Sequence, residues 1–437
     1  MAQETAAPVK TSSGVVNVGP IGRFLAATEI DTRMLGMVGA LALVWVSFNF
    51  LSGGVFLTPR NLWNLSVQSS EVAVMATGMV LVIVTRNIDL SVGSVLGFIG
   101  MVMATLQAEI LPQVVGFDFW ATWIIVLAVG LVCGAVIGAI HGFIIAYLRV
   151  PAFIVTLGGY LVWRGAAWWV TSGRTVAPLD STFQLMGGGP SGSIGLWPSW
   201  IVGAIACIAI VATIIDGRRQ RLRFSFPLRP IWAEIVIGSA GCAATLAAVA
   251  VANAYPWPKM IADRYAAANH ITVPEGGLFI STGIAIPVLI ALGAAIVMTF
   301  VTRRTRFGRY VFAMGGNPEA AELAGINTRW ITMKIFIVVG MLCAVSAAIA
   351  TARLNAATNA LGTLDELYVI AAAVIGGTSF AGGIGTIAGA MVGAVVMQSL
   401  QSGMVLIGVQ SPLQSIVVGT VLVFAVWLDT LYHQRAN

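Results

Sequence analysis

Polar side chains interrupt the apolar sequence at residues 86–94, which read RNIDLSVGS. Apolar runs flank this stretch, with VAVMATGMVLVIVT before it and VLGFIGMVMATL after it. The polar groups could form a tight turn in which Asp89 caps the next helix. They could also line a polar path where the backbone is broken inside a membrane, because irregular backbone at that depth must be satisfied by protein or by a water-filled cavity. Both interpretations stay open for Asn87, Asp89, Ser91 and Ser94.

A second interruption lies near the C-terminus, where GGTSFAGGIG (residues 376–385) separates two further apolar runs. Thr378 and Ser379 supply its hydroxyl groups. Paired interruptions in the two halves of a transporter point to a transport pathway. The two segments are therefore predicted to line or gate the path of a small polar solute, and simple capped turns are the alternative.

Arg164 lies inside the apolar run 153–171. A charged side chain within a membrane span is costly and usually faces protein or water. Glu71 and Asp89 are candidate partners. A structural pairing of Arg164 is favoured over a contact with the substrate. Arg164 is nevertheless counted among the candidate residues of the path.

Membrane helices must position these side chains, because 58% of the 437 residues are hydrophobic and only 9% are charged. An ordinary soluble domain has about 25% charged residues. Runs of about 20 apolar residues, the length that crosses a bilayer, recur along the chain. The composition predicts an all-α polytopic membrane protein of about twelve transmembrane segments. The predicted spans are 34–57, 68–85, 91–108, 120–147, 153–171, 199–215, 231–253, 279–302, 331–352, 366–380, 383–405 and 411–431.

The charge distribution predicts the sides of the membrane. The basic clusters RRQRLR (218–223) and RRTRFGR (303–309) fall on the same side as both termini. Cytoplasmic loops are rich in Lys and Arg, so both termini are predicted to be cytoplasmic. Residues 1–30 are expected to be a disordered tail, and residues 31–437 a single transmembrane domain.

Glycines at positions 130, 134, 138 and 142 share one face of the fourth predicted span. Four-residue spacing of small residues lets two helices approach closely. Close helix packing is the predicted role of this stripe.

The loop at residues 303–330 contains the features of a short helix. Asn317 is a good N-cap, Pro318 suits the first helical position, and Glu319 lies in the first turn, where the helix dipole favours an anion. Gly325 can end the helix in a left-handed conformation. A helix of about two turns is marginal alone, so it is expected to dock into a partner or to lie on lipid headgroups. Its apolar stripe consists of Ala320, Leu323 and Ala324.

This loop, in GNPEAAELAGIN, resembles the coupling segment of the permease subunits of bacterial ABC sugar importers, the branch with ribose and xylose permeases. RNIDLSVGS and AAVIGGTSFAGGIGTIAGAMVGA (372–394) are similar to two further signatures of that family. The resemblance implies that the coupling helix docks on a separate ATPase subunit. The residues concerned are Asn317, Pro318, Glu319, Ala320, Ala321, Glu322, Leu323, Ala324 and Gly325.

The resemblance also implies the rest of the assembly. The permease would be a homodimer in the bacterial inner membrane, fed by a periplasmic sugar-binding protein, with ATP and Mg²⁺ bound by the ATPase and no cofactor on this chain. The solute would be a monosaccharide such as xylose or a similar pentose. Members of the family are pictured with about ten spans, so residues 199–253 are interpreted as an extra hairpin.

Several other functions are excluded or disfavoured. No GxxxxGK[ST] motif is present, so the chain is not expected to hydrolyse ATP itself, and no HExxH or CxxC spacing indicates an enzyme or a metal site. The net charge of +6 is explained by the cytoplasmic loops and not by nucleic acid. The main alternative is an ion-coupled secondary transporter. It would need acidic groups deep in several spans, whereas carboxylates within the spans are few, among them Glu71, Asp89 near an end and Glu234 near a start.

Overall fold

The computed structural model describes residues 27–29, 32–274 and 277–436, and within them the chain is helical apart from four isolated β-bridges. The N-terminal tail predicted to be disordered lies almost entirely outside the described residues. In chain order the long helices are α2 (Thr32–Leu51), α3 (Pro59–Val84), α4 (Val92–Thr105), α6 (Thr122–Ala146), α7 (Ala152–Thr171), α9 (Leu196–Arg223), α10 (Ile231–Ala254), α12 (Ile286–Arg304), α15 (Thr328–Leu354), α17 (Ile387–Leu406) and α18 (Ser411–Ala436). The shorter elements are η1 (Leu106–Ile110), α5 (Leu111–Val115), α8 (Ser181–Gln184), η2 (Leu185–Gly187), α11 (Lys259–Ala268), α13 (Arg306–Gly316), α14 (Pro318–Leu323) and α16 (Asp365–Ile375).

Among the described residues, 9 helical segments are long and apolar enough to cross a membrane. They are α2, α3, α4 with η1 and α5, α6, α9, α10, α12, α15 and α17. This confirms an all-helical polytopic membrane fold. The figure of twelve crossings, which adds α7, α16 and α18, stays a prediction.

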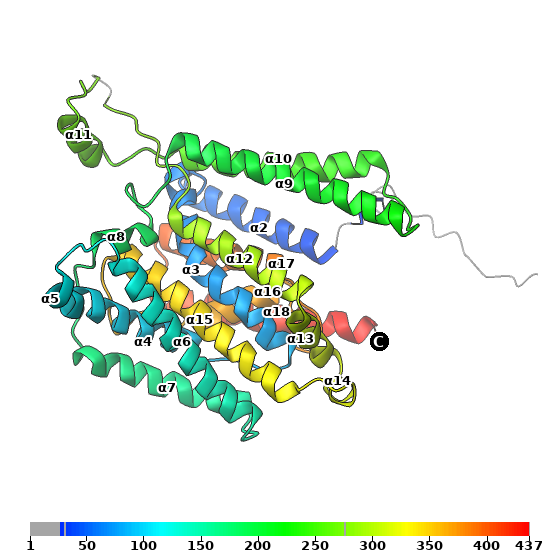
Figure 1. The fold of residues 1–437 in the computed structure, drawn as a ribbon. Coiled ribbons are helices and arrows are strands. Elements are labelled where there is room, and N and C mark those ends of the chain that lie inside the picture. Colours follow the sequence, from blue (N-terminus) through cyan, green and yellow to red (C-terminus); the bar gives the residue numbers. More distant parts are fainter. Residues whose placement is uncertain (1–26, 30–31, 275–276, 437) are drawn as a thin grey trace, which may run out of the picture.

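The helices run side by side along one direction, with α3 at the centre of the bundle (Figure 1). Every residue of α3 from Ser69 to Val84 is buried. Helices α12, α15, α16 and α17 pack around it, α6 packs on α15, and α4 lies between α7 and α15. A sequence that is apolar on all sides of a helix favours such a central position.

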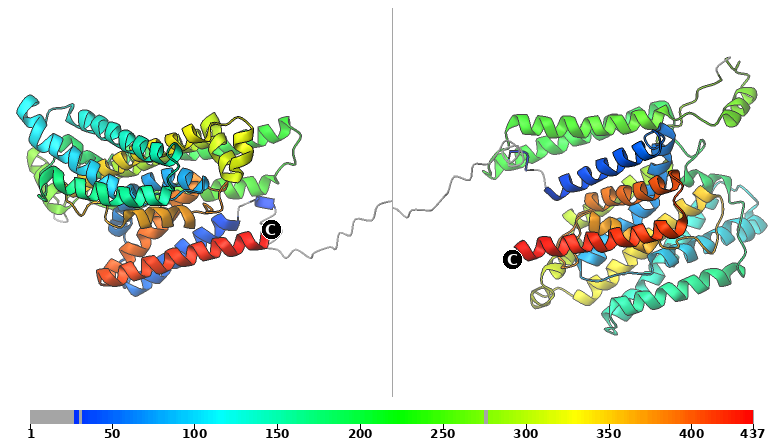
Figure 2. Two further views of the ribbon diagram at one scale, coloured as in Figure 1. Left: turned by 90° about the horizontal axis from the view of Figure 1, so that it is seen from below. Right: turned by 180° about the vertical axis from the view of Figure 1, so that it is seen from behind.

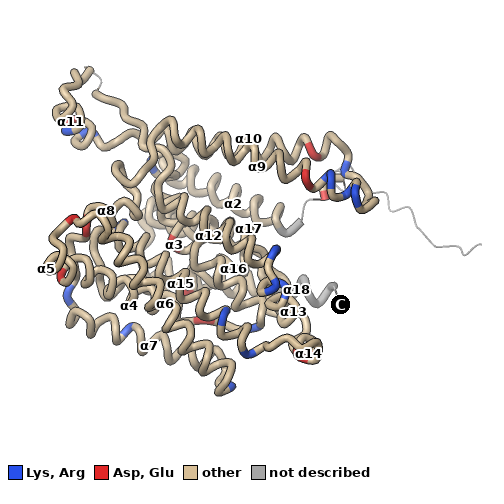
Figure 3. Tube along the Cα trace, viewed as in Figure 1, with Lys and Arg blue, Asp and Glu red and all other residues tan. Residues whose placement is uncertain are grey.

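The two ends of the bundle differ in charge. At one end lie α13, α14 and the loop between α9 and α10, and many of the Lys and Arg residues gather there (Figure 3). We call this the basic end. Helices α5, α8 and α11 lie at the opposite end. The grouping agrees with the predicted cytoplasmic side, although which end faces the cytoplasm stays a prediction.

The glycine stripe of α6 packs against α15 through backbone contacts. A Cβ added at Gly134 would lie 2.1 Å from the carbonyl oxygen of Gly340, and one added at Gly138 would lie 2.1 Å from that of Phe336. At Gly142 the nearest atom is the Cα of Met333, at 2.7 Å. The predicted role in close packing is confirmed at these positions.

The hairpin of α9 and α10 lies along one flank of the bundle and α7 along the opposite flank (Figure 2). Most side chains of the hairpin are exposed. At the basic end Glu29 accepts from Arg221 Nη1 at 2.9 Å and from Arg229 Nε at 3.0 Å. Its hydrogen bonds to Arg221 and Arg229 lower the pKa of Glu29 from 4.5 to about 2. The contact is therefore complete above pH 4.5 and is lost only as the pH falls towards 2.

Candidate translocation site and coupling loop

The helix predicted in the loop at residues 303–330 is α14. Asn317 Oδ1 accepts from the N–H of Ala320 at 2.9 Å, and Pro318 is the first helical residue. Gly325 has a φ of 81°, and the N–H of Ile326 donates to the carbonyl of Ala321 at 3.1 Å. The predicted cap, first residue and left-handed end are confirmed. Their use in coupling is a separate question.

Helix α14 projects from the basic end (Figure 1), and most of its residues are exposed. Leu323 is 90% exposed, Ala320 and Ala324 are exposed, and Glu319 and Glu322 lie beside them. Only Ala321 is buried. An exposed leucine on a rigidly capped helix is a feature of a docking surface.

The end of α13, which leads into α14, contacts both interrupted segments. Gly315, near the end of α13, lies so close to α3 that an added Cβ would be 2.1 Å from the carbonyl oxygen of Val84 and 2.7 Å from the N–H nitrogen of Gly383. Arg86 donates to the carbonyls of Gly315 at 3.1 Å and Gly316 at 3.0 Å. The end of α3, the end of α13 and the glycine-rich segment therefore form one junction.

The connection between α3 and α4 is recessed into the bundle. A Cβ added at Gly159 would lie 3.4 Å from the Cβ of Ser91. Gly159 is about 10 Å along α7 from its first residue, Ala152, at 1.5 Å per residue. Asp89 Oδ1 accepts from the N–H of Ser91 at 2.8 Å, so residues 89–91 form a local turn. Ser91 is the N-cap residue of α4 and no side chain caps that helix, so the predicted cap by Asp89 is wrong. The segment thus combines a local turn with a position well inside the helix bundle.

A polar chain runs from this connection to α7. The hydroxyl of Ser91 donates to Asp89 at 2.6 Å and lies 3.4 Å from His141 Nδ1. Trp163 Nε1–H donates to His141 Nε2 at 3.0 Å, so the ring proton of a neutral His141 is on Nδ1 and points to Ser91. A space of about 10 Å³ beside Asp89, Ser91 and His141 has room for about one water molecule. Asn87, by contrast, bonds to Thr85 in the turn.

The second interruption follows α16, which has only 11 residues. That length covers about 16 Å, or roughly half of a hydrocarbon core about 30 Å thick. Thr378 and Ser379 are fully buried after it, and Thr378 Oγ1 has no hydrogen-bond partner among the described residues. The segment that follows α16 therefore lies within the bundle.

Arg164 donates hydrogen bonds to the backbone of the segment that precedes α16. Its guanidinium donates to the carbonyls of Asn359 at 3.0 Å, Leu361 at 2.8 Å and Gly362 at 3.2 Å. The structural pairing agrees with the expectation, but Glu71 and Asp89 are not the partners. Glu71 lies 3.7 Å from Arg353, and Asp89 bonds to Ser91. Carbonyls of irregular backbone inside a membrane need such donors, which explains the charge in this helix.

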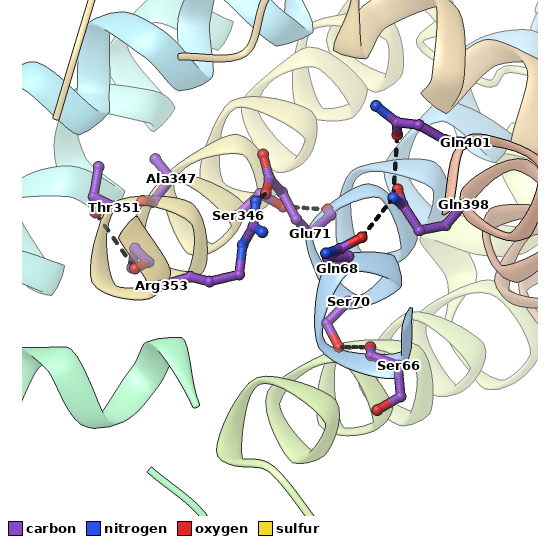
Figure 4. Close-up of polar contacts among 11 residues, drawn as sticks. Ser66, Gln68, Ser70, Glu71, Ser346, Ala347, Thr351, Arg353, Gln398 and Gln401 are labelled. Carbon is purple, nitrogen blue, oxygen red and sulfur yellow. Dashed lines mark hydrogen bonds and ion pairs between the residues drawn. The ribbon is translucent and has the colours of Figure 1, made fainter. Parts of the chain in front are cut away.

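A cavity of about 610 Å³ lies between α3, α17 and the segment from the end of α15 to the start of α16. Its wall is rich in amides and also carries the charged groups of Glu71, Arg353 and Asp365, the first two of which lie side by side in Figure 4. We call it the polar vestibule. Its lining residues are Asn61, Asn64, Gln68, Glu71, Val72, Arg353, Leu354, Thr358, Ala360, Leu361, Gly362, Thr363, Asp365, Gln398, Gln401, Ser402, Val405 and Leu406.

The sequence-predicted path residues do not line the vestibule. None of the seven is among its lining residues, and five of them are buried: Asp89, Ser91, Ser94, Thr378 and Ser379. A sequence signal for the vestibule exists, because Asn61, Asn64, Gln68 and Glu71 repeat at intervals of three and four residues. This spacing places four polar groups on one face of α3.

Residues 61–426 match the family described as branched-chain amino acid transport system / permease component. The chain belongs to this permease family. It is 34% identical over 421 residues to the xylose transport system permease protein of Escherichia coli K12, covering 95% of this chain and 96% of the relative. It is 36% identical over 402 residues to the Haemophilus influenzae protein of the same name, covering 92% and 97%. The ribose import permease protein of Escherichia coli K12 is 31% identical over 380 residues, covering 86% and 87%. No solved structure matches the chain significantly.

Membership confirms the class of protein predicted from the three motifs. The permease is a multi-pass protein of the bacterial inner membrane and a component of a transport system, not an enzyme. The relatives are permeases of import systems, which does not support the ion-coupled secondary transporter. The description of the family names amino acids whereas the relatives name sugars, so membership alone does not give the solute.

Proposed function

We propose that the chain is the membrane subunit of an ATP-driven ABC importer that moves a monosaccharide, xylose or a similar pentose, into the cytoplasm. The names of the relatives with 34% and 36% identity support this solute. The uncharged amides of the polar vestibule suit a solute that has hydroxyl groups and no charge.

The partners in this proposal are a separate ATPase subunit, which binds ATP and Mg²⁺, a periplasmic sugar-binding protein and a second copy of the permease. The observation that carries the proposal is α14. It exposes Leu323 almost completely and is fixed through α13 and Arg86 to both interrupted segments. Closure of the ATPase would push on α14, and the junction would pass that movement to the path.

The interrupted segments form the inner closure of the path in this scheme. Their polar groups are buried in one conformation and reach the solute when the junction moves. The residues proposed for this role are Asn87, Asp89, Ser91, Ser94, Arg164, Thr378 and Ser379.

Substitution of the exposed leucine tests the coupling role. Leu323→Asp is expected to lower ATP-driven xylose uptake at least about tenfold, since a central apolar contact of an interface typically contributes about 2 kcal/mol or more. Uptake is measured in right-side-out or reconstituted vesicles that contain the ATPase and ATP in the lumen and the binding protein outside, together with copurification of the ATPase. Leu228→Asp is the matched control, because Leu228 is also exposed at the basic end, in the loop between α9 and α10.

Gly325→Val is a second variant for the same role. Its φ of 81° strains any β-branched residue, so the end of α14 should be displaced while the spans remain folded. Normal uptake by both variants at wild-type protein levels would show that α14 is not the coupling element. Uptake of xylose without any ATPase, driven by an ion gradient, would reject the importer class itself.

A further inference from the structure

We propose that the polar vestibule is a binding site for the solute within the permease, selective for neutral pentoses. The proposal rests on the proposed function, because it takes the solute from there. It adds a specific place on this chain at which the sugar pauses between release from the binding protein and entry to the cytoplasm.

The wall of the vestibule carries five amide side chains from two helices. Asn61, Asn64 and Gln68 come from α3, and Gln398 and Gln401 come from α17. An amide offers both donors and acceptors, as a sugar hydroxyl does. One wall can therefore donate to some hydroxyl groups of a sugar and accept from others. Amides held inside a membrane protein are costly unless they have partners. Their concentration on facing sides of one cavity therefore points to a polar, uncharged ligand.

Existing hydrogen bonds hold the wall in position and leave donors free. Gln398 Nε2 donates to Gln68 Oε1 at 3.1 Å and to Gln401 Oε1 at 3.1 Å (Figure 4). Ser402 Oγ lies 3.2 Å from Asn61 Oδ1 on the same side. The NH₂ groups of Gln68 and Gln401 have no protein acceptor in the part of the chain that the structure describes. They are available to hydroxyl oxygens of a sugar.

Three charged residues line the vestibule, Glu71, Arg353 and Asp365, and we call them its floor. Their charges favour an uncharged ligand. Glu71 Oε2 lies 3.7 Å from Arg353 Nη2, and Asp365 stands beside them at the start of α16. Two carboxyl groups and one guanidinium can bind the hydroxyls of a sugar as acceptors and donor. The excess of acceptor groups disfavours a phosphate or a carboxylate, which would need further cations.

The size and depth of the vestibule fit the same ligand. Its volume of about 610 Å³ lies within the range of about 300–1,000 Å³ for small-molecule sites. The wall runs from Asn61 to Glu71, about 15 Å along α3 at 1.5 Å per residue. The floor lies against Leu361 and Gly362, the irregular segment that Arg164 binds. A sugar at the floor would therefore touch the segment that has to move for it to pass.

Loss of the amide pair tests the site. In Gln68→Leu/Gln398→Leu both partners of one hydrogen bond are replaced together. Gln401 loses the donor to its Oε1, but it is half-buried and lines the cavity, so water can replace that donor and the fold should be preserved. Xylose uptake by the intact importer is expected to fall about tenfold or more, as expected when several hydrogen bonds to a solute are lost. ATP hydrolysis stimulated by the loaded binding protein should remain. Ser70→Ala is the matched control, because its hydroxyl bonds to the carbonyl of Ser66 at 2.8 Å on the same helix, outside the vestibule.

Protection of a cysteine tests occupancy directly. Ser402→Cys is introduced after the free cysteines Cys133, Cys207, Cys242 and Cys343 are changed to alanine. A hydrophilic maleimide should react with it severalfold more slowly in D-xylose than in buffer, and no more slowly in xylose 5-phosphate or sodium chloride.

The two measurements together decide the inference. Protection by D-xylose together with loss of uptake in the double variant supports it. Absence of protection, equal protection by salt, or normal uptake in the double variant would overturn it. The importer class is judged separately, by ATP-dependent uptake in the wild-type vesicles of the same series.

Discussion

The guanidinium of Arg164, on α7, binds the non-helical backbone between α15 and α16. Three carbonyls, of Asn359, Leu361 and Gly362, depend on it. The sequence indicated that this charge has a structural partner, because an unpaired arginine inside a span is too costly. The partner itself could not be predicted, since the fold of residues 355–364 depends on contacts with helices from distant parts of the chain.

We predict that Arg164→Leu lowers the free energy of unfolding by about 3 kcal/mol, because three buried carbonyls lose a charged donor. Arg164→Lys should recover only part of this, since an ammonium cannot reproduce the planar fork. Thermal unfolding of the purified permease in detergent measures both. Arg174→Leu is the control: its side chain is 67% exposed and lies 3.4 Å from Glu109, so its loss should change stability by less than about 1 kcal/mol. Equal effects at the two positions would contradict the role given to Arg164.

At the scale of helices, the contact between α6 and α15 follows directly from glycine spacing. Gly134 and Gly138 let the backbone of α15 approach to distances that no side chain allows. This contact was predictable, because four-residue spacing defines one face of a helix. The shortness of α16 was not predictable, and the recess of residues 86–91 was only one of two open interpretations, because a count of apolar residues does not show where a backbone bends inside the bundle.

Gly138→Leu should separate α6 from α15 and destabilise the fold by about 3 kcal/mol, the upper range for overpacking. The fraction of permease that stays monodisperse on heating in detergent measures the effect. Gly158→Ala on α7 is the control, because nothing lies within 4 Å of its added Cβ. There the loss of glycine in a helix should be neutral or slightly stabilising. A tolerated leucine at Gly138 would show that the two helices can move apart freely.

For the whole molecule, the separation of charge between the two ends gives an orientation that can be measured. In a cysteine-free chain, Leu323→Cys should react with an impermeant maleimide only when the reagent reaches the cytoplasm. Tyr265→Cys on α11, at the opposite end, should react in intact spheroplasts. Both positions are exposed, so access depends on the side of the membrane. Labelling of Leu323→Cys from outside would reverse the orientation and remove α14 from the reach of an ATPase.

The class of the whole protein was predictable from three short motifs, and its family is confirmed. The polar vestibule was not predicted, although half of its wall has a visible spacing on α3. Its other half comes from α17, some 330 residues later, so only the folded chain brings Gln68 and Gln398 into contact. The interruptions at residues 86–94 and 376–385 gave no signal for the vestibule, because its amides lie on helix faces within apolar runs.

Helix α3 joins the two functional ends of the molecule as a single rod. Its first turns form the amide wall and reach down to Glu71, and its last carbonyl and Arg86 are bound to α13 and to the glycine-rich segment. Every residue from Ser69 to Val84 is buried, and the helix runs without a break from Pro59 to Val84. A helix is stiff along its axis, so a displacement of α3 at Val84 is transmitted to Gln68 almost undiminished. The end of α3 that contacts α13 and the wall of the proposed sugar site would then move together, without an intermediate element between them.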